Sequence, residues 1–183
     1  ADDGSSATLA AAYDFGNGFT VAGGISGAGG ETEGLFTKES LDVYGIQAAY
    51  NTDSYGVSLS YALTDTSATA ESSVWGLNAF YSFDGEGLPS ISIGYESEDP
   101  SASATEEGYF VGLTWDSVGP GSLSVGMSTL ENYTDAQDEL YQYEAAYSYD
   151  INDGMTITPG IFIREIANAD DQTGVILKTS FSF

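Results

Sequence analysis

The carboxylates are the side chains of this sequence that could do the most chemistry. Asp and Glu together number 28 and Lys and Arg number 3, histidine and cysteine do not occur, and the formal net charge is −25. The lack of cysteine and histidine excludes disulfides, thiolate nucleophiles, zinc fingers and any mechanism with a histidine base. Phosphate contacts need Lys and Arg, so the composition also predicts that nucleic acid is not a partner.

Carboxylates can also serve catalysis and metal binding. A pair of carboxylates can act as acid and base in a glycosidase, and Glu106 and Glu107 are candidates by residue type. Nothing in their surroundings distinguishes them from solvated charges, so we expect no enzyme. The acidic segments lack the spacing of an EF-hand and the glycine-rich nonapeptide repeat of calcium-binding β-helices. We therefore expect neither a metal site nor a cofactor.

The elements that position these carboxylates are predicted to be β-strands. Apolar and polar residues alternate with period 2 in residues 141–150, 155–164 and 174–183, and the same alternation recurs towards the N-terminus. We count eleven such segments. Each runs roughly 8 to 11 residues, which is the span of a tilted strand that crosses a membrane.

The connections between these strands alternate in length. Short links rich in Gly, Asn and Asp are expected at residues 16–18, 51–54, 84–88, 117–121 and 151–154. Longer links are expected at residues 27–40, 64–72, 98–107, 131–139 and 165–172. Alternating short turns and long loops are typical of an antiparallel transmembrane β-barrel, with the long loops outside the cell.

A soluble acidic β-sandwich, acting as a surface-binding or adhesion module, is the alternative, because its strands alternate too. Two features favour the barrel. Aromatic residues stand near the strand ends, as at Tyr50 and Tyr55 on one side and Trp75 and Tyr95 on the other, which is typical of membrane interfaces. The face opposite the apolar one carries mainly Ser, Thr, Gly and Ala, which suits a water-filled interior.

Most acidic residues fall in the longer links or near them. We name the following set the acidic mouth: Glu31, Glu33, Asp65, Glu71, Glu98, Asp99, Glu106, Glu107, Asp135, Asp138, Glu139, Asp170 and Asp171. One interpretation is a solvated rim that prevents aggregation. The other is an electronegative entrance that concentrates cations and repels anions. Both can hold together, and we expect a preference for cations.

The basic residues were interpreted separately. Lys38 falls in a link, whereas Arg164 and Lys178 fall on the polar face of the last two strands, where they and Glu144 are expected on the channel wall. The turn positions predict one row formed by Glu144, Gly160 and Lys178. Two strand spacings separate the backbones of Glu144 and Lys178 by about 10 Å, so their side chains could pair over the glycine. Two independently solvated groups are the alternative.

The C-terminal part carries a resemblance. The strand pair around Thr158-Pro159-Gly160-Ile161-Phe162 and the terminal Lys178-Thr-Ser-Phe-Ser-Phe183 resemble the C-terminal end of cyanobacterial outer-membrane porins, which are similar to the carbohydrate-selective porin family. The close match covers residues 143–183. The resemblance implies passive diffusion of inorganic ions and small hydrophilic solutes, sugars among them, a location in the bacterial outer membrane, a homotrimer, and a sorting signal at Phe181 and Phe183. The S-layer-homology domain of many family members does not occur in residues 1–183.

The number of strands presents a parity problem. Single-chain bacterial barrels have even strand numbers, whereas eleven strands would place the N-terminus outside the cell. Open sheet edges are not tolerated in lipid. We therefore expect residues 1–183 to be the C-terminal portion of a larger barrel, of about 16 strands as the resemblance implies. The remaining strands would come from another segment or a second chain.

Overall fold

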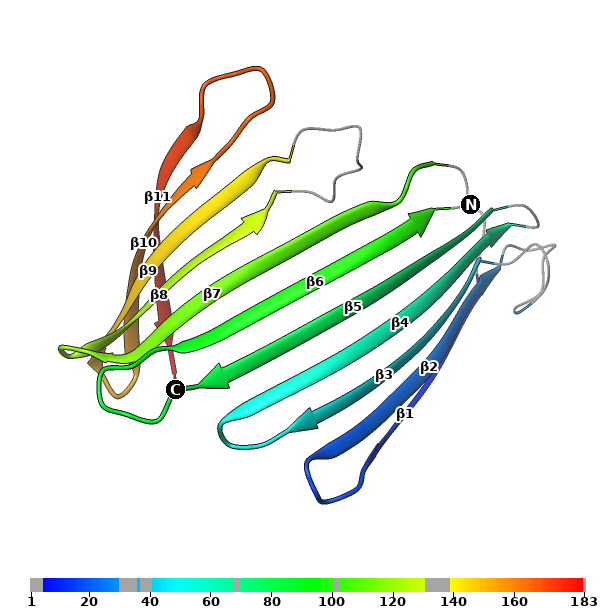
Figure 1. Ribbon diagram of the computed structural model, residues 1–183, viewed down its shortest axis with the longest axis horizontal. Coiled ribbons are helices and arrows are strands. Elements are labelled where there is room, and N and C mark those ends of the chain that lie inside the picture. The colour runs from blue at the N-terminus through cyan, green and yellow to red at the C-terminus, as the bar shows by residue number, and fades with distance from the viewer. Residues whose placement is uncertain are drawn as a thin grey trace. The chain divides into compact units, whose positions relative to one another are not determined.

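In the computed structural model, the described residues form eleven strands (Figure 1). The structure describes residues 5–29, 36, 41–67, 70–100, 103–130 and 139–182. The strands are β1 (Ser5–Asp14), β2 (Phe19–Gly29), β3 (Leu41–Asn51), β4 (Tyr55–Ser67), β5 (Ala70–Ser82), β6 (Ser90–Pro100), β7 (Glu106–Val118), β8 (Gly121–Thr129), β9 (Tyr141–Asn152), β10 (Met155–Arg164) and β11 (Gln172–Phe181).

The strands form one sheet in which neighbours follow the order of the chain, from β1 to β11. Every strand pair whose register is described is antiparallel. The prediction of an all-β, antiparallel fold with eleven strands in this chain is confirmed. No helix in the described ranges is long and apolar enough to cross a membrane.

The contacts divide the chain into two compact units, which we describe separately. Unit 1 comprises Ala1–Asn78 and Tyr95–Glu107, and unit 2 comprises Ala79–Gly94 and Gly108–Phe183. Successive side chains of a strand point to opposite sides of the sheet. In each unit, two residues that pair across neighbouring strands therefore lie on the same face of the sheet. A register therefore defines rows of side chains that cross several strands on one face.

In unit 1 the two faces differ sharply in composition. One face carries rows of large apolar side chains: Leu9, Ile25, Tyr44 and Leu63, then Tyr13, Val21, Ala48 and Leu59. The other carries rows of small or polar side chains: Thr8, Ser26, Val43 and Thr64, then Ala10, Gly24, Gly45 and Ala62, then Ala12, Ala22, Gln47 and Ser60. Thr8 and Ser26 are joined by a 2.8 Å hydrogen bond between their hydroxyls.

Unit 2 follows the same rule. Its apolar rows include Val111, Met127, Tyr143 and Ile163, then Leu113, Val125, Ala145, Ile161 and Val175. Its polar rows include Phe110, Ser128, Gln142, Arg164 and Gln172, then Gly112, Gly126, Glu144, Phe162 and Gly174. We call the second kind of surface the polar face in each unit.

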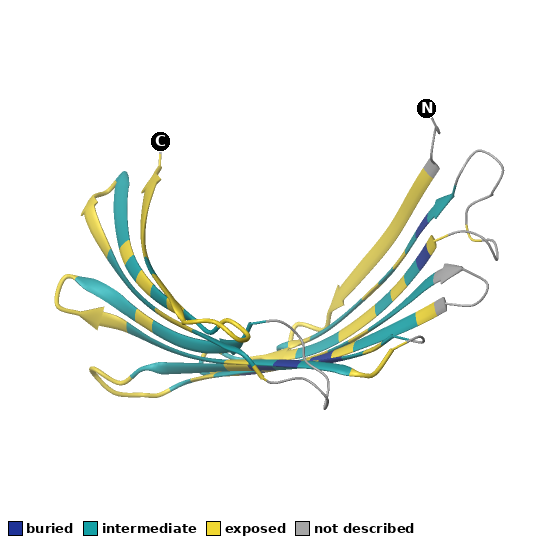
Figure 2. Cartoon of the chain, turned by 90° about the horizontal axis from the view of Figure 1, so that it is seen from above, coloured by how far each residue is buried: buried dark blue, intermediate teal, exposed yellow. Residues whose placement is uncertain are grey.

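Large side chains of the apolar face are exposed in both units. Within the described residues no hydrophobic side chain is buried, and large ones such as Val175 reach 83% exposure (Figure 2). A β-sandwich would pack this face of one sheet against a second sheet. The described strands instead form a single sheet, so the alternative of a soluble β-sandwich is wrong.

Two of the expected long links are shorter than predicted. β4 continues to Ser67 and β5 begins at Ala70, so most of residues 64–72 is strand. Likewise β6 continues to Pro100 and β7 begins at Glu106. Thr64 and Asp65 pair with Val43 and Asp42 of β3, and Thr is a favourable residue in strands. Polar composition indicated loops there, but these polar residues extend the ladder.

The turn between β7 and β8 depends on a close approach at Gly121. The ring of Tyr147 lies beside it, and the Tyr147 hydroxyl donates a 2.8 Å hydrogen bond to the carbonyl of Val118. A Cβ at Gly121 would lie 2.2 Å from the carbonyl oxygen of Ser148, whereas one at Gly112 in the same hairpin would meet its nearest atom at 3.9 Å.

We expect Gly121→Ala to destabilise the folded protein by about 1–3 kcal/mol, because a backbone oxygen must move to admit the methyl group. Gly112→Ala is the matched control and should leave stability nearly unchanged. The measurement is the temperature at which the folded band is lost on a gel run without boiling. Equal losses for the two variants would contradict the close approach.

Candidate functional site

The polar face of unit 2 contains an open groove, which we call the unit 2 groove. It has a volume of about 350 Å³ and lies mainly over β7, β8 and β9. Its polar and aromatic lining residues are Ser92, Phe110, Thr114, Ser124, Ser128, Gln142 and Glu144, together with Gly112 and Gly126. The hydroxyls of Thr114 and Ser124 are 3.2 Å apart and form a hydrogen bond.

Glu144 is the charged residue of this groove. Its side chain is exposed, and its Oε1 accepts a hydrogen bond from the amide of Gln142 on the same face of β9. In the register Glu144 stands between Gly126 of β8 and Phe162 of β10. Its neighbour on β8 is a glycine, so the carboxylate is not covered by a side chain from that position.

The predicted row of Glu144, Gly160 and Lys178 is wrong. Gly160 pairs with Ala146 of β9 and Ile176 of β11, while Lys178 pairs with Thr158. Glu144 on β9 pairs with Phe162 of β10, so Glu144 and Lys178 flank β10 in rows that are two rows apart. Glu144 pairs two residues further along β10 than the turn-centre estimate placed it, and Lys178 pairs two residues away from Gly160 as well, so both turn centres were misplaced.

The structure places Arg164 and Lys178 on the polar face. Arg164 stands in a row between Gln142 and Gln172, and its Nε is buried without a hydrogen-bond partner among the described residues. Lys178 is exposed. The role of Glu144, Arg164 and Lys178 as channel-wall residues remains a prediction.

Phe162 shows a contact that the sequence interpretation missed. A Cβ at Gly174 would lie 2.3 Å from Cζ of the Phe162 ring, so the ring occupies the space above this glycine. Phe162 therefore leans towards β11, away from the groove side of Glu144. A glycine inside a strand is the sequence signal for such a close approach.

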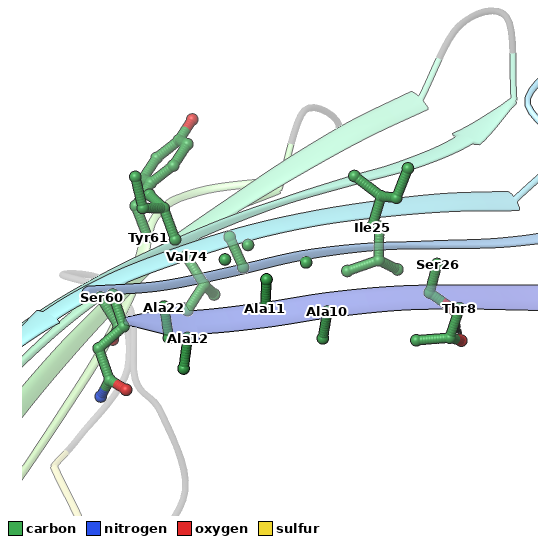
Figure 3. Close-up of a pocket in the computed structure, with 17 residues that line it drawn as sticks. Thr8, Ala10, Ala11, Ala12, Ala22, Ile25, Ser26, Ser60, Tyr61 and Val74 are labelled. Atoms are coloured by element: carbon green, nitrogen blue, oxygen red, sulfur yellow. Dashed lines mark hydrogen bonds between the residues drawn. The ribbon is translucent and has the colours of Figure 1, made fainter. Parts of the chain in front are cut away.

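Unit 1 has a second open cavity, of about 710 Å³, over β1 to β4 (Figure 3). Figure 3 shows Ile25 and Tyr61 on one side of the sheet and Ala12 and Ser60 on the other. The row of Ala10, Gly24, Gly45 and Ala62 runs through it. No Asp, Glu, Lys or Arg lines this cavity.

The residues of the acidic mouth lie in different settings. Asp65 in β4 pairs with the buried Asp42, and its Oδ1 is buried without a hydrogen-bond partner in the described part of the chain. Glu71 is the second residue of β5, and Glu98 and Asp99 precede the last residue of β6. The exposed members are Glu71, Asp99, Glu139, Asp170 and Asp171. Glu31, Glu33, Asp135 and Asp138 lie outside the described residues, as does Lys38.

Two carboxylates of this set contact tyrosines. The Tyr95 hydroxyl donates a 2.5 Å hydrogen bond to Glu107 Oε1, and the Tyr141 hydroxyl donates to Glu139 Oε2. Glu106 precedes Glu107 at the start of β7 and is partly buried. The sequence interpretation treated these acids as free charges and missed their link to the aromatic strand ends.

Aromatic rings meet at both ends of the strands. On the short-turn side, the ring centroids of Phe15 and Phe19 are 5.3 Å apart and those of Tyr50 and Tyr55 are 6.0 Å apart. On the other side, Trp75 and Tyr95 are 5.0 Å apart, and Tyr109 and Tyr141 are 6.3 Å apart. Phe181 ends β11 opposite Met155, and Phe183 lies outside the described residues.

A single antiparallel sheet with an exposed apolar face, aromatic residues at both strand ends and a polar opposite face defines a transmembrane β-strand protein of the bacterial outer membrane. The family model of Gram-negative porins matches residues 1–163, and the chain belongs to this family. The predicted porin-type fold and the outer-membrane location are confirmed.

Comparison with solved structures gives a similarity to the "KdgM porin in complex with disordered oligogalacturonate". The identity is 10%, the TM-score is 0.47, and the alignment covers 100% of this chain and 95% of that one. No curated protein matches the sequence.

Proposed function

We propose that the protein is a passive diffusion channel for inorganic ions and small hydrophilic solutes, with a preference for cations. Membership of the porin family supports a channel in the outer membrane rather than an enzyme. The observation that carries the proposal is the contrast between the two faces of the sheet. An apolar face suits lipid, whereas a face of Ser, Thr, Gly, Ala and a few charges suits a water-filled interior.

The cation preference rests on charge. Exposed carboxylates of the acidic mouth, such as Asp99, Asp170 and Asp171, stand at or beyond the strand ends on the long-link side. Only Lys38, Arg164 and Lys178 oppose 28 acidic residues in the whole sequence. An entrance lined by carboxylates raises the local concentration of cations and lowers that of anions.

We further propose partners for the sheet besides outer-membrane lipid. In the described sheet β1 and β11 each have one neighbour. Unpaired backbone groups are costly in lipid, so further strands from another segment or a second chain should pair with both edges. An antiparallel barrel has an even number of strands, and the described part of the chain supplies eleven. A fully antiparallel closure therefore needs an odd number of further strands.

The resemblance of residues 143–183 to cyanobacterial carbohydrate-selective porins supports three finer proposals. These are sugars among the solutes, a homotrimer, and a sorting signal formed by Phe181 and Phe183. The mass of the protein extracted from its native membrane, measured by light scattering in detergent, tests the trimer. A monomeric mass would reject it without affecting the proposed channel.

Single-channel conductance of the native assembly in a planar bilayer under a KCl gradient tests the proposed function. We expect large ohmic steps and a reversal potential directed towards K⁺. Steps with a reversal potential near zero would reject the cation preference alone. A folded, reconstituted protein that gives no steps would reject the channel.

A further inference from the structure

The bottom of the unit 2 groove, which we call its floor, is formed by a row that contains two glycines. Gly112 and Gly126 face each other in the register, and Glu144 follows in the same row. Because neither glycine has a side chain, the floor beside the carboxylate is bare backbone over two strands. The volume of about 350 Å³ is at the lower end of the range of roughly 300–1,000 Å³ that small-molecule sites occupy.

The rows on either side of the floor supply the walls. In one neighbouring row Phe110 of β7 pairs with Ser128 of β8, which pairs with Gln142 of β9. In the other, Thr114 pairs with Ser124. The Phe110 side chain is 40% exposed, so it is accessible to a ligand above the floor.

The charge that lines the groove is negative. Glu144 is the ionisable residue of the lining, and no lysine or arginine lines the groove. The Gln142 amide donates a hydrogen bond to Oε1, which orients the carboxylate, and no described residue donates to Oε2. Arg164 stands opposite Gln142 on β10 and is not part of the lining.

We propose that the unit 2 groove is a binding subsite for a small organic cation that carries an ammonium group. The ammonium pairs with the Glu144 carboxylate and donates to the neighbouring hydroxyls, and the Phe110 ring attracts the cation or covers the carbon skeleton attached to it. An anion is disfavoured, since no basic group lines the groove. The inference rests on the proposed channel, because it requires the polar face to be reached by solutes from water.

The test uses three solutes of one ring size: glucosamine, which is cationic, glucose, which is neutral, and glucuronate, which is anionic. Each is added to the reconstituted native assembly while the single-channel current is recorded. We expect glucosamine to reduce the current at a concentration at least tenfold lower than glucose or glucuronate. Glu144→Gln should abolish the difference between glucosamine and glucose, and Phe110→Leu should weaken the glucosamine effect several-fold.

Asp150→Asn is the matched control, because Asp150 lies on the same face of β9 but outside the groove, where it accepts a hydrogen bond from Thr156. It should leave the glucosamine effect unchanged. Equal effects of glucose and glucosamine, or a glucosamine effect that survives Glu144→Gln, would overturn the proposal. The folded band on an unboiled gel verifies that each variant folds.

Calorimetric titration of the detergent-solubilised protein with glucosamine measures binding to the subsite independently of conductance. Binding that Glu144→Gln removes supports the subsite even if no current flows, in which case the channel proposal alone fails. Current steps without glucosamine binding leave the channel intact and overturn the subsite.

Discussion

Arginine in place of Ile46 is expected to prevent stable insertion of the protein into a bilayer, whereas arginine at the adjacent Gln47 is expected to be tolerated. Ile46 lies near the middle of β3 on the apolar face and is 59% exposed, so it would contact lipid in a porin. A charge at the bilayer midplane on the lipid face of a barrel costs about 2–4 kcal/mol. Gln47 points to the polar face, where water solvates the guanidinium.

The measurement is refolding from urea into lipid vesicles, followed by the fraction of the folded band on an unboiled gel and by its loss in denaturant. Ile46→Ala separates loss of the apolar side chain from gain of charge and should retain most of the folded band. If Gln47→Arg blocked insertion and Ile46→Arg did not, the assignment of the two faces would be reversed.

Neutralising exposed acids of the acidic mouth is expected to reduce the proposed cation preference of the channel several-fold. The variant Asp99→Asn, Asp170→Asn, Asp171→Asn removes three exposed carboxylates. At 0.1 M salt the Debye length is about 10 Å, so these charges act on ions that enter nearby, while at 1 M it is about 3 Å and they are screened. The reversal potential should move towards zero at low salt.

Salt supplies the control within the same variant. At 1 M KCl the wild type and the triple variant should give the same reversal potential within error. If the reversal potentials of the variant and the wild type differed equally at both salt concentrations, the substitutions would have changed the structure of the pore. If they never differed, these three carboxylates would have no effect on ion selectivity.

The period-2 pattern predicted the strands and their faces well, because the alternation of apolar and polar residues is a direct consequence of strand geometry. It also placed Arg164 and Lys178 on the face where the structure has them. The lengths of two links were overestimated, since polar residues that extend a strand beyond its apolar part, as at Asp65, have the composition of a loop.

Register and local contacts could not be predicted in the same way. Glu144 pairs with Phe162 and Lys178 pairs with Thr158 instead of Gly160, because the pairings estimated from the turn centres were two residues off in both strand pairs. The unit 2 groove depends on two glycines, Gly112 and Gly126, being paired, and the sequence gives no direct measure of pairing across a turn. The contact of Tyr95 with Glu107 and the approach of the Phe162 ring to Gly174 likewise depend on strand pairing and side-chain direction.

The row of Ala10, Gly24, Gly45 and Ala62 has a consequence for the residence time of solutes. Four neighbouring strands present methyl groups or hydrogen atoms there, and their backbone polar groups are engaged in the ladder. A hydrophilic molecule beside this row finds few free donors or acceptors and no charge to delay it. This row is thus suited to rapid passage in the proposed channel, and retention of a permeating molecule should depend on the hydroxyls of the neighbouring rows, such as Thr8 and Ser60, and on the carboxylate of unit 2.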